Sequence, residues 1–285
     1  MKIGLIGTGN MGQAILRGCL KAKPREASGV YVYNHHLEKA QRLGRELGIN
    51  ACGSIEELVM ASQLVLLAVK PYHFAEVMPQ VAKAYEGAAD KDEKIIVSIA
   101  AGVTIQQMED YFRRQAGPAE GLSGEKHEAG VKIVRVMPNT PALVGEAMSS
   151  VSANACTDSK SLEAVLELFR WVGRAEAVEE KLIDAVIGVS GSSPAYVYMF
   201  IEALADGAVA EGMQRDKAYA FAAQAVFGAA KMVLETGKHP GELKDQVCSP
   251  GGTTILAVKE LEERGLRAAV LNAVHTAAEK SRAMS

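Results

Sequence analysis

The chain has 285 residues, of which 48% are hydrophobic and 23% charged, and a formal net charge of −3. This balance is typical of a globular protein that can bury a sizeable core over two domains, and the charge gives no reason to expect nucleic acid or an anionic membrane as a partner. No apolar run reaches the length of a bilayer span and a strand pattern follows Lys2 directly, so we expect no signal peptide and a cytoplasmic protein.

An apolar strand pattern over Lys2–Ile6 runs straight into the glycine-rich turn Gly7-Thr8-Gly9-Asn10-Met11-Gly12, and a helical pattern follows. Gly7 permits the tight turn, Gly9 lets the backbone approach a pyrophosphate, and Gly12 lets the helix pack closely on the strand. We expect the free N–H groups and the positive dipole end at the N-terminus of that helix to face the anion. We therefore predict a dinucleotide site at Gly7, Gly9, Asn10, Met11 and Gly12; a glycine-rich turn that only packs is the alternative.

Short β-branched runs alternate with amphipathic stretches through the first half of the chain. The strands are predicted at Lys2–Ile6, Val30–Tyr33, Leu64–Ala68, Ile95–Ile99, Ile133–Val136, Met148–Ser152 and Ala175–Val178, with helices that include Leu37–Leu47, Ile55–Ala61 and Phe74–Tyr85. Ser54 with Glu57, and Thr104 with Gln107, have capping-box spacing. The alternation predicts an α/β, Rossmann-type domain over residues 1–178, with a mostly parallel sheet, helices on both faces and ligands beyond the carboxyl ends of the strands.

The second predicted strand ends in Asn34-His35-His36. Asn34 lies where an acid would hold the ribose 2′-hydroxyl of NAD, and no acid is present. Asn34, His35, His36 and Lys39 offer donors and partial positive charge, which suits a 2′-phosphate. We therefore favour NADPH over NADH, with NADH still possible; the alternative is an exposed histidine pair without a role.

Three further strand ends could meet a ligand at the same edge of the sheet. They are Ala68-Val69-Lys70 before Pro71, Ala100-Ala101-Gly102, and the Met137–Pro141 segment with Asn139. The last two segments have small side chains or a proline-bent backbone, and they suit the walls and floor of a nicotinamide pocket. A solvated lysine and plain strand-to-loop turns are the alternative interpretations.

Residues 113–130 hold several glycines, one proline and scattered charge, with little to bury. This composition predicts a mobile surface loop without chemistry. The four cysteines (Cys19, Cys52, Cys156, Cys248) form no C-x-x-C pair, so we expect reduced, mostly buried thiols and no metal site.

After Val178 the pattern becomes helical throughout, which predicts a second domain over residues 179–285. A helix over Pro194–Glu211 is apolar on most sides, and a second over Lys217–Thr236 is rich in alanine and ends at Gly237. Such wide apolar faces predict that another subunit completes the core, as an intertwined dimer at least; a self-sufficient helical bundle is the alternative. Glu202 and Asp206 suit a structural role or the dimer contact better than catalysis.

A Pro-Gly-Gly turn joins two of these helical segments at Val247-Cys248-Ser249-Pro250-Gly251-Gly252-Thr253-Thr254-Ile255. The turn directs backbone N–H groups outward just before a helix that begins near Thr253. Such a nest can hold a carboxylate, with the Thr254 hydroxyl beside it. From spacing alone, a purely structural turn is equally compatible with this pattern.

Together these segments resemble the pyrroline-5-carboxylate reductases over nearly the whole chain. The resemblance rests on the residues 7–12 turn, residues 68–71, residues 137–141, residues 188–194 and, most specifically, residues 240–262. In that last segment the chain matches the family pattern at Leu243, Val247, Cys248, Ser249, Gly251, Gly252, Thr254, Ala257, Val258 and Leu261.

The resemblance implies reduction of L-1-pyrroline-5-carboxylate to L-proline with NADPH or NADH, the final step of proline biosynthesis. It implies a C-terminal helical dimerisation domain and a homo-oligomer, often a ring of dimers. Carried over by position, Ser249, Gly251, Gly252 and Thr253 would bind the substrate carboxylate and Thr254 would hydrogen-bond the ring nitrogen as the catalytic residue. The cofactor would contact residues 9–11, Asn34 and His35, Ala68, Val69 and Lys70, Ala100, Ala101 and Gly102, and Asn139.

This chain departs from the family pattern at one place. In many relatives the residue after the asparagine is an arginine or serine that binds the 2′-phosphate, whereas this chain has His35 and His36.

Two other functions stay open: a related two-domain dehydrogenase acting on another imine or a hydroxy acid, and a non-enzymatic NADP(H)-binding regulator. Such dehydrogenases usually carry a proton-transferring lysine in the helical domain, and the helix over Pro194–Glu211 contains none.

Overall fold

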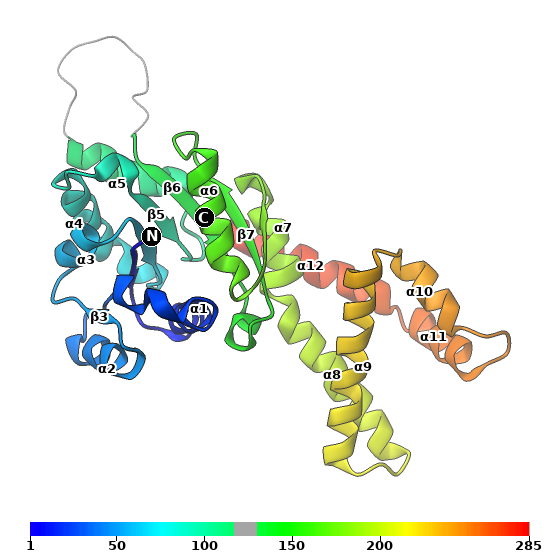
Figure 1. The fold of residues 1–285 in the computed structure, drawn as a ribbon. Coiled ribbons are helices and arrows are strands. Elements are labelled where there is room, and N and C mark those ends of the chain that lie inside the picture. The colour runs from blue at the N-terminus through cyan, green and yellow to red at the C-terminus, as the bar shows by residue number, and fades with distance from the viewer. Residues whose placement is uncertain (117–129, 285) are drawn as a thin grey trace, which may run out of the picture. The chain divides into compact units, whose positions relative to one another are not determined.

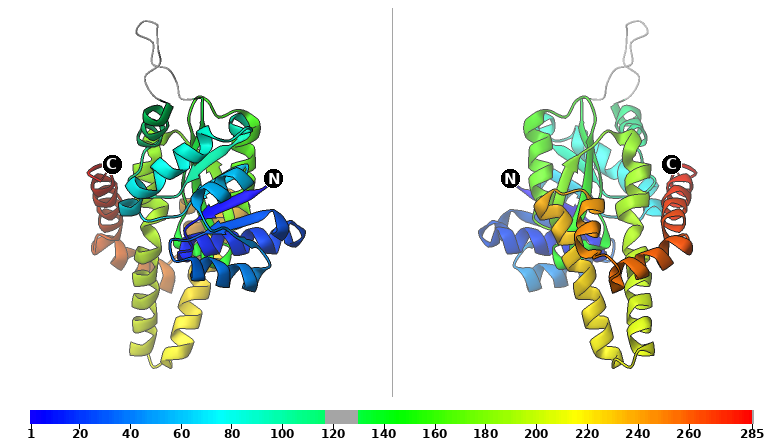
Figure 2. Two further views of the ribbon diagram at one scale, coloured as in Figure 1. Left: turned by 90° about the vertical axis from the view of Figure 1, so that its left-hand side faces the viewer. Right: turned by 90° about the vertical axis from the view of Figure 1, so that its right-hand side faces the viewer.

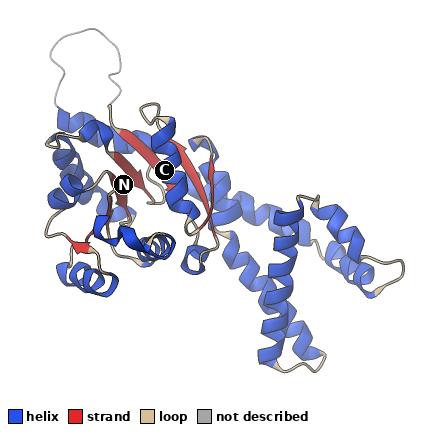
Figure 3. Ribbon diagram, in the orientation of Figure 1, coloured by secondary structure: helices blue, strands red, loops and turns tan. Residues whose placement is uncertain are grey.

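The computed structural model describes residues 1–116 and 130–284. The chain divides into two compact units, one of Met1–Gly191 with Ala278–Ser285 and one of Ser192–Ala277. The strands of the described residues all lie in the first unit, and the second is helical (Figure 3). The predicted domain boundary after Val178 stays a prediction.

Strands of the described residues form one eight-stranded sheet in the order β3-β2-β1-β4-β5-β6-β7-β8 (Figure 1). They are β1 (Ile3–Ile6), β2 (Val30–Tyr33), β3 (Asn50–Ala51), β4 (Leu64–Leu67), β5 (Ile95–Ser98), β6 (Lys132–Met137), β7 (Ala147–Ala153) and β8 (Gly173–Ala177). Neighbouring strands are parallel except β6 and β7, which are antiparallel. The predicted mostly parallel, Rossmann-type sheet is therefore confirmed. Sequence reasoning missed β3, because it has only two residues and both are exposed.

Helices cover both faces of this sheet (Figures 1 and 2). One apolar core joins the sheet to α1 (Asn10–Ala22), α2 (Leu37–Leu47) and α6 (Ser159–Arg170). A second core joins it to α3 (Ile55–Ala61), α4 (Phe74–Glu86) and α5 (Ile105–Ala116). Because both faces are covered, β1, β4 and β5 are buried along their whole length, which explains their nearly continuous apolar sequences.

Short helical segments complete the first unit. They are η1 (Pro24–Gly29), η2 (Pro71–His73), η3 (Lys91–Glu93), η4 (Thr140–Val144), η5 (Glu180–Leu182), α7 (Ile183–Val186) and the π-helical turn η6 (Ile187–Gly191). The last residues of the chain also pack here, where the Ser281 hydroxyl donates to Asp184 Oδ1 at 2.6 Å.

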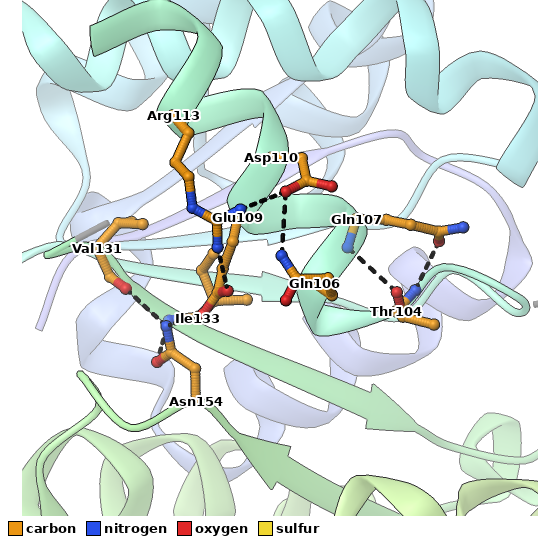
Figure 4. A network of polar contacts seen from close by, with 9 residues as sticks. All are labelled: Thr104, Gln106, Gln107, Glu109, Asp110, Arg113, Val131, Ile133 and Asn154. Carbon is orange, nitrogen blue, oxygen red and sulfur yellow. Dashed lines mark hydrogen bonds and ion pairs between the residues drawn. The ribbon is translucent and has the colours of Figure 1, made fainter. Parts of the chain in front are cut away.

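The predicted capping boxes fix the starts of α3 and α5. At α5 the box is reciprocal: Gln107 N donates to Thr104 Oγ1 at 3.1 Å and Thr104 N donates to Gln107 Oε1 at 2.9 Å (Figure 4). At α3, Glu57 N donates to Ser54 Oγ at 3.0 Å, but the Glu57 carboxylate accepts from Gly53 N instead of Ser54 N. Both predicted helix starts are therefore confirmed. At α3 the glutamate side chain bonds the residue before the N-cap instead of the N-cap itself.

The loop predicted over residues 113–130 begins too early. Residues 113–116 are the last turn of α5, where Arg113 donates to Asp110 at 2.5 Å and to Glu109 at 3.1 Å (Figure 4). These ion pairs one turn apart extend the helix past the point where the composition changes. Residues 117–129 lie outside the described part of the chain.

The second unit consists of α8 (Ser193–Ala210), α9 (Arg215–Thr236), α10 (Pro240–Val247), α11 (Thr253–Glu263) and the first part of α12 (Leu266–Arg282). Helices α8 and α9 lie side by side (Figures 1 and 2). Asp206 forms an ion pair with Arg215 across their connection, consistent with a structural role. The predicted helix end at Gly237 is confirmed, since this glycine has φ +65°.

This unit leaves most of its large apolar side chains uncovered within one chain. Its buried apolar core consists of Ala205, Ala218 and Ala222. Large side chains such as Met199 and Phe221 are 70% and 68% exposed, and Leu256 and Leu271 are 64% and 70% exposed. Apolar exposure on this scale marks a protein interaction surface. Among the described residues no helix is both long and apolar enough to cross a membrane.

Candidate functional site

The turn between β1 and α1 has a geometry that only glycine permits at two positions. Gly7 has φ +99°, and a Cβ there would lie 2.8 Å from the Ala68 carbonyl oxygen. A Cβ at Gly12 would lie 2.7 Å from the Gly7 carbonyl oxygen and 3.1 Å from Ala68 Cβ. The predicted roles of Gly7 in the turn and of Gly12 in close helix packing are therefore confirmed.

Gly9 is different, because nothing in the chain requires glycine there. It has φ −71°, and a Cβ would meet no atom within 4 Å. Gly9 is also the N-cap of α1, which has no side-chain cap and no acid in its first turn. Open space at the bare N-terminus of a 13-residue helix is a place where an anion can approach the backbone.

Side chains from two segments hold this turn in place. Gln13 Nε2 donates to the Thr8 carbonyl oxygen at 2.8 Å. Asn34 Nδ2 donates to Thr8 Oγ1 at 2.7 Å, while Asn34 Oδ1 accepts from His36 N at 2.9 Å. Asn34 thus ties the end of β2 to the glycine turn. Sequence reasoning missed Thr8 and Gln13; the buried position of Thr8 inside the turn follows only from the fold.

One cleft of about 420 Å³ opens beside the glycine turn. It gathers many of the predicted cofactor residues from three strand ends: Gly7, Gly9, Asn34, His35, Ala68, Val69 and Lys70. His36, Lys39, Tyr72, His73 and Glu76 also line it. Asn10 lies on a different groove along α1, and Met11 packs against the core of the sheet. The cleft is therefore built by segments far apart in sequence, at the carboxyl ends of β1, β2 and β4.

The remaining predicted cofactor residues follow β5 and β6, the next strands in the sheet. Gly102 has φ +75°, and a Cβ there would lie 3.2 Å from the Met284 carbonyl oxygen. Asn139 holds its loop in place, because Nδ2 donates to the Ser190 carbonyl oxygen at 3.0 Å and Oδ1 accepts from Met148 N at 2.9 Å. Ala100 is buried beside Ser98, whose hydroxyl accepts from Ala100 N at 3.2 Å.

A partly buried ion pair secures this second edge, and sequence reasoning missed it. Arg135 on β6 is 5% exposed, and its Nη1 donates to Glu180 Oε1 at 2.9 Å. The same oxygen accepts from Ile105 N, the first residue of α5, at 2.8 Å. Glu180 therefore joins η5, β6 and the helix that follows Gly102. The sequence signal was an arginine among the apolar residues of Ile133–Met137.

The predicted Pro-Gly-Gly turn lies between α10 and α11 of the second unit. Gly251 has φ +68°, and Gly252 N donates to the Ser249 carbonyl oxygen at 3.0 Å. A Cβ at Gly252 would lie 2.3 Å from Ser249 Oγ, so a side chain fits there only if the Ser249 hydroxyl rotates away. Helix α11 begins at Thr253, as predicted, with Gly252 as N-cap, no side-chain cap and no acid in its first turn. The backbone N–H groups of that turn are available to an anion.

None of the four cysteines forms a disulfide. Burial raises the pKa of Cys19 to about 11 and the pKa of Cys52 to about 11, so neither thiol supplies a thiolate nucleophile near neutral pH. Cys156 and Cys248 are half-buried. Within the described residues, no cluster of three or more histidine, cysteine or acidic side chains could hold a metal ion.

Comparisons with known proteins match both units. A family model described as pyrroline-5-carboxylate reductase dimerisation matches residues 180–284, and one described as NADP oxidoreductase, coenzyme F420-dependent, matches residues 2–102. The pyrroline-5-carboxylate reductases of Escherichia coli and Methanosarcina acetivorans are 48% and 43% identical over 284 residues. These matches cover 100% and 99% of this chain, and 98% and 97% of the relatives.

Two solved structures share the whole fold. The pyrroline-5-carboxylate reductase of Coxiella burnetii has a TM-score of 0.87 at 29% identity, covering 100% of this chain and 98% of its own. The pyrroline carboxylate reductase of Plasmodium falciparum, solved with NADP bound, has a TM-score of 0.81 at 31% identity with the same coverage.

The glycines of the first turn form a matched pair for mutation. We expect Gly12→Ala to lower the free energy of unfolding by about 1–3 kcal/mol, because its Cβ would overlap the Gly7 carbonyl. We expect Gly9→Ala to leave stability within about 0.5 kcal/mol, since nothing in the chain meets its Cβ, yet to weaken dinucleotide binding at least about tenfold. Denaturant unfolding and calorimetric titration measure both; equal dinucleotide affinity in Gly9→Ala and the unmodified protein would contradict the role of Gly9.

Proposed function

The chain belongs to the pyrroline-5-carboxylate reductase family, and on that premise we infer that it reduces L-1-pyrroline-5-carboxylate to L-proline with NADPH. The observation that carries this inference is full-length identity of 48% to the Escherichia coli reductase, which spans both units of the chain. The two backbone anion cradles, at residues 7–12 and 249–254, agree with a phosphate-bearing cofactor and a carboxylate-bearing substrate.

We propose that the α10–α11 turn binds the substrate carboxylate. The bare N–H groups at the start of α11, which has 11 residues, and the concave backbone at Gly251 and Gly252 support this role. Ser249 lies beside Gly252 and adds a hydroxyl at the same turn. Holding the carboxylate here fixes which face of the ring accepts the hydride.

Thr254 is proposed as the catalytic residue. It is the second residue of α11 and is half-buried, so its hydroxyl can hydrogen-bond the imine nitrogen next to the bound carboxylate. The protonated imine is already an electrophile, so the protein need supply no nucleophile, in keeping with the raised pKa values of the Cys19 and Cys52 thiols. Bound NADPH supplies the hydride. Thr254, or a water that it holds, then supplies or stabilises the proton on nitrogen.

The cofactor is proposed to lie along the carboxyl edge of the sheet. Gly7, Gly9, Asn10, Met11 and Gly12 would hold the pyrophosphate, with Asn34 and His35 at the adenosine ribose and Ala68, Val69 and Lys70 along the wall. Ala100, Ala101, Gly102 and Asn139 would border the nicotinamide. Open space at Gly9 and the anchored Asn139 loop support this course. Four cysteines without a disulfide support the proposal that the protein works in a reducing compartment, the cytoplasm.

The homo-oligomer expected from the dimerisation domain is proposed to be a ring of dimers. Exposed large side chains lie on α8 and α9 and also on α11 and α12, for example Met199, Phe221, Leu256 and Leu271. Exposed apolar residues on these four helices offer more surface than a dimer contact through α8 and α9 alone would cover. Light scattering gives the mass in multiples of 30.3 kDa, and a mass that stays at two chains would contradict the ring.

An assay of NADPH oxidation tests the function directly. We expect steady oxidation with pyrroline-5-carboxylate and formation of proline, and none with simple hydroxy acids. Turnover on a hydroxy acid in place of the cyclic imine would favour the related dehydrogenase. Cofactor binding without turnover on any cyclic imine would favour a non-enzymatic regulator.

The role of Thr254 predicts a separation between turnover and cofactor binding. We expect Thr254→Val, which keeps the branched shape without the hydroxyl, to lower kcat by about 10²-fold, the smaller end of the effect of a lost proton-transfer group. Thr254→Ala should behave alike. Calorimetric titration should give nearly the same Kd for NADPH in both variants, and a large loss of NADPH binding would contradict this division of roles.

The uncovered helical surface predicts a charge-sensitive assembly. We expect Phe221→Glu to dissociate the oligomer and lower Tm, because a charge would be buried where another subunit covers this side chain. Leu143→Glu is the matched control, since Leu143 is 62% exposed in the first unit and should leave the mass unchanged. An unaltered mass for Phe221→Glu would place the subunit contact elsewhere.

A further inference from the structure

Residues 180–191 lie between β8 and Ser192, the first residue of the second unit, and we refer to them as the connecting segment. The segment comprises η5, α7 and the π-helical turn η6, and it packs as part of the first unit. Ile183 is 1% exposed and Gly188 is buried, so both its middle and its last turn are anchored there. Turns of π-helix recur at functional sites, and the contacts of this segment point to a role beyond a simple connection.

The side-chain amide of Asn139 uses both of its ends to hold the loop after β6. Its Oδ1 accepts from Met148 N at 2.9 Å, and its Nδ2 donates to the Ser190 carbonyl oxygen at 3.0 Å. An asparagine amide offers one acceptor oxygen and two N–H donors. Because the oxygen and one donor are committed to backbone groups, the half-buried Asn139 side chain acts mainly on the position of its own loop.

The Ser190 carbonyl can accept this hydrogen bond because of the residue one turn later in the chain. In a continuous α-helix it would accept from the N–H of residue 194, and Pro194 has no N–H. The Ser190 hydroxyl donates to the Val186 carbonyl oxygen at 3.1 Å, which holds Ser190 against the preceding turn. The π-helical turn and the proline after it therefore leave one backbone acceptor for the loop after β6.

The other end of the connecting segment holds the start of α5, which follows the loop after β5. Glu180 Oε1 accepts from Ile105 N at 2.8 Å and from Arg135 Nη1 at 2.9 Å. Ile105 is the first residue of α5, and its N–H is one of those that a helix leaves without an internal partner. Because β5 and β6 are parallel neighbours, the loops after them leave the sheet at the same edge. The connecting segment therefore secures both loops, one at each of its ends.

We propose that Asn139 and Glu180 are positioning residues, through which the connecting segment sets the spacing of the two loops that border the nicotinamide. This rests on the proposed function, in which residues 100–102 and the loop of Asn139 lie beside the ring of the bound cofactor. The rate of hydride transfer depends on the distance and angle between donor and acceptor, and a displacement of about 1 Å can lower it about 10²-fold. The adenosine end is proposed to lie in the cleft beside the glycine turn, which neither Asn139 nor Glu180 lines. Loss of either contact should therefore disturb the nicotinamide end alone.

Two variants of Asn139 test this separation. Asn139→Ala removes both hydrogen bonds of the amide, and Asn139→Asp keeps an oxygen for Met148 N but loses the donor to the Ser190 carbonyl. In both we expect kcat for pyrroline-5-carboxylate to fall about 10²-fold, while the Kd for NADPH in calorimetric titration stays within about threefold. The nicotinamide emission of bound NADPH should differ from that of NADPH in solution, and both variants should shift it toward the solution value because the ring is held less firmly.

Glu180 allows a test by rescue. Glu180→Gln keeps a side-chain oxygen that can accept from Ile105 N, whereas Glu180→Ala removes it. We expect Glu180→Ala to lower kcat about tenfold with little change in the Kd for NADPH, and Glu180→Gln to restore most of the lost kcat. These variants and Asn139→Asp carry the test if Asn139→Ala does not fold.

Ser152→Ala is the matched control. The Ser152 hydroxyl donates to the Val178 carbonyl oxygen at 2.8 Å, a side-chain bond to backbone just before the connecting segment, and Ser152 contacts neither loop. Its loss should lower Tm and leave kcat and the NADPH emission unchanged.

The proposal is overturned if Asn139→Ala keeps the kcat of the unmodified protein, if it loses NADPH affinity as strongly as kcat, or if Ser152→Ala loses kcat to the same extent. Equal emission from NADPH bound to the unmodified protein and NADPH in solution would also overturn it. Absence of turnover by the unmodified protein on pyrroline-5-carboxylate would instead contradict the proposed function, and the emission of bound NADPH would still test the positioning role.

Discussion

The close approach of α1 to the sheet at Gly12 is the constraint on which the first half of the molecule depends. A Cβ at this position would lie 2.7 Å from the Gly7 carbonyl oxygen and 3.1 Å from Ala68 Cβ, so no other residue fits without moving the helix or the strands. This approach brings the bare N-terminus of α1 to the ends of β1 and β4. The Thr8–Asn34 hydrogen bond then adds the end of β2 to the same edge, and the cleft follows from these three contacts.

The two proposed anion sites consist mainly of backbone. The turn at residues 7–12 and the turn at residues 249–254 both precede a helix without a side-chain cap or an acid in its first turn. Glycine is required at Gly7 and Gly12 by backbone atoms of the chain itself, whereas at Gly9 it leaves open space. Because the substrate is an electrophile and the cofactor carries the hydride, fixed dipoles and one hydroxyl are sufficient for the proposed chemistry.

The second unit has the exposed apolar surface that a dimerisation domain requires. Three alanines form its buried core, while side chains such as Met199 and Phe221 remain mostly exposed in one chain. A unit of this size cannot offset the entropy of ordering its helices with so little buried apolar area. Its folding must therefore be coupled to association.

Local sequence patterns determined much of this protein. The glycine turn, the bounds of α2 and α3, the start of α11 at Thr253 and the helix end at Gly237 all follow from residues next to one another in the chain, because turn conformation, capping and periodicity act over a few residues. The tertiary structure alone decided which side chains hold the turns in place. Asn34 donates a hydrogen bond to Thr8, and Glu180 accepts from both Arg135 and the first residue of α5. It also decided the two-residue β3 and the gathering of His35, His36 and Lys39 at one cleft. These features depend on contacts between segments tens of residues apart, and a pattern read along the chain does not contain them.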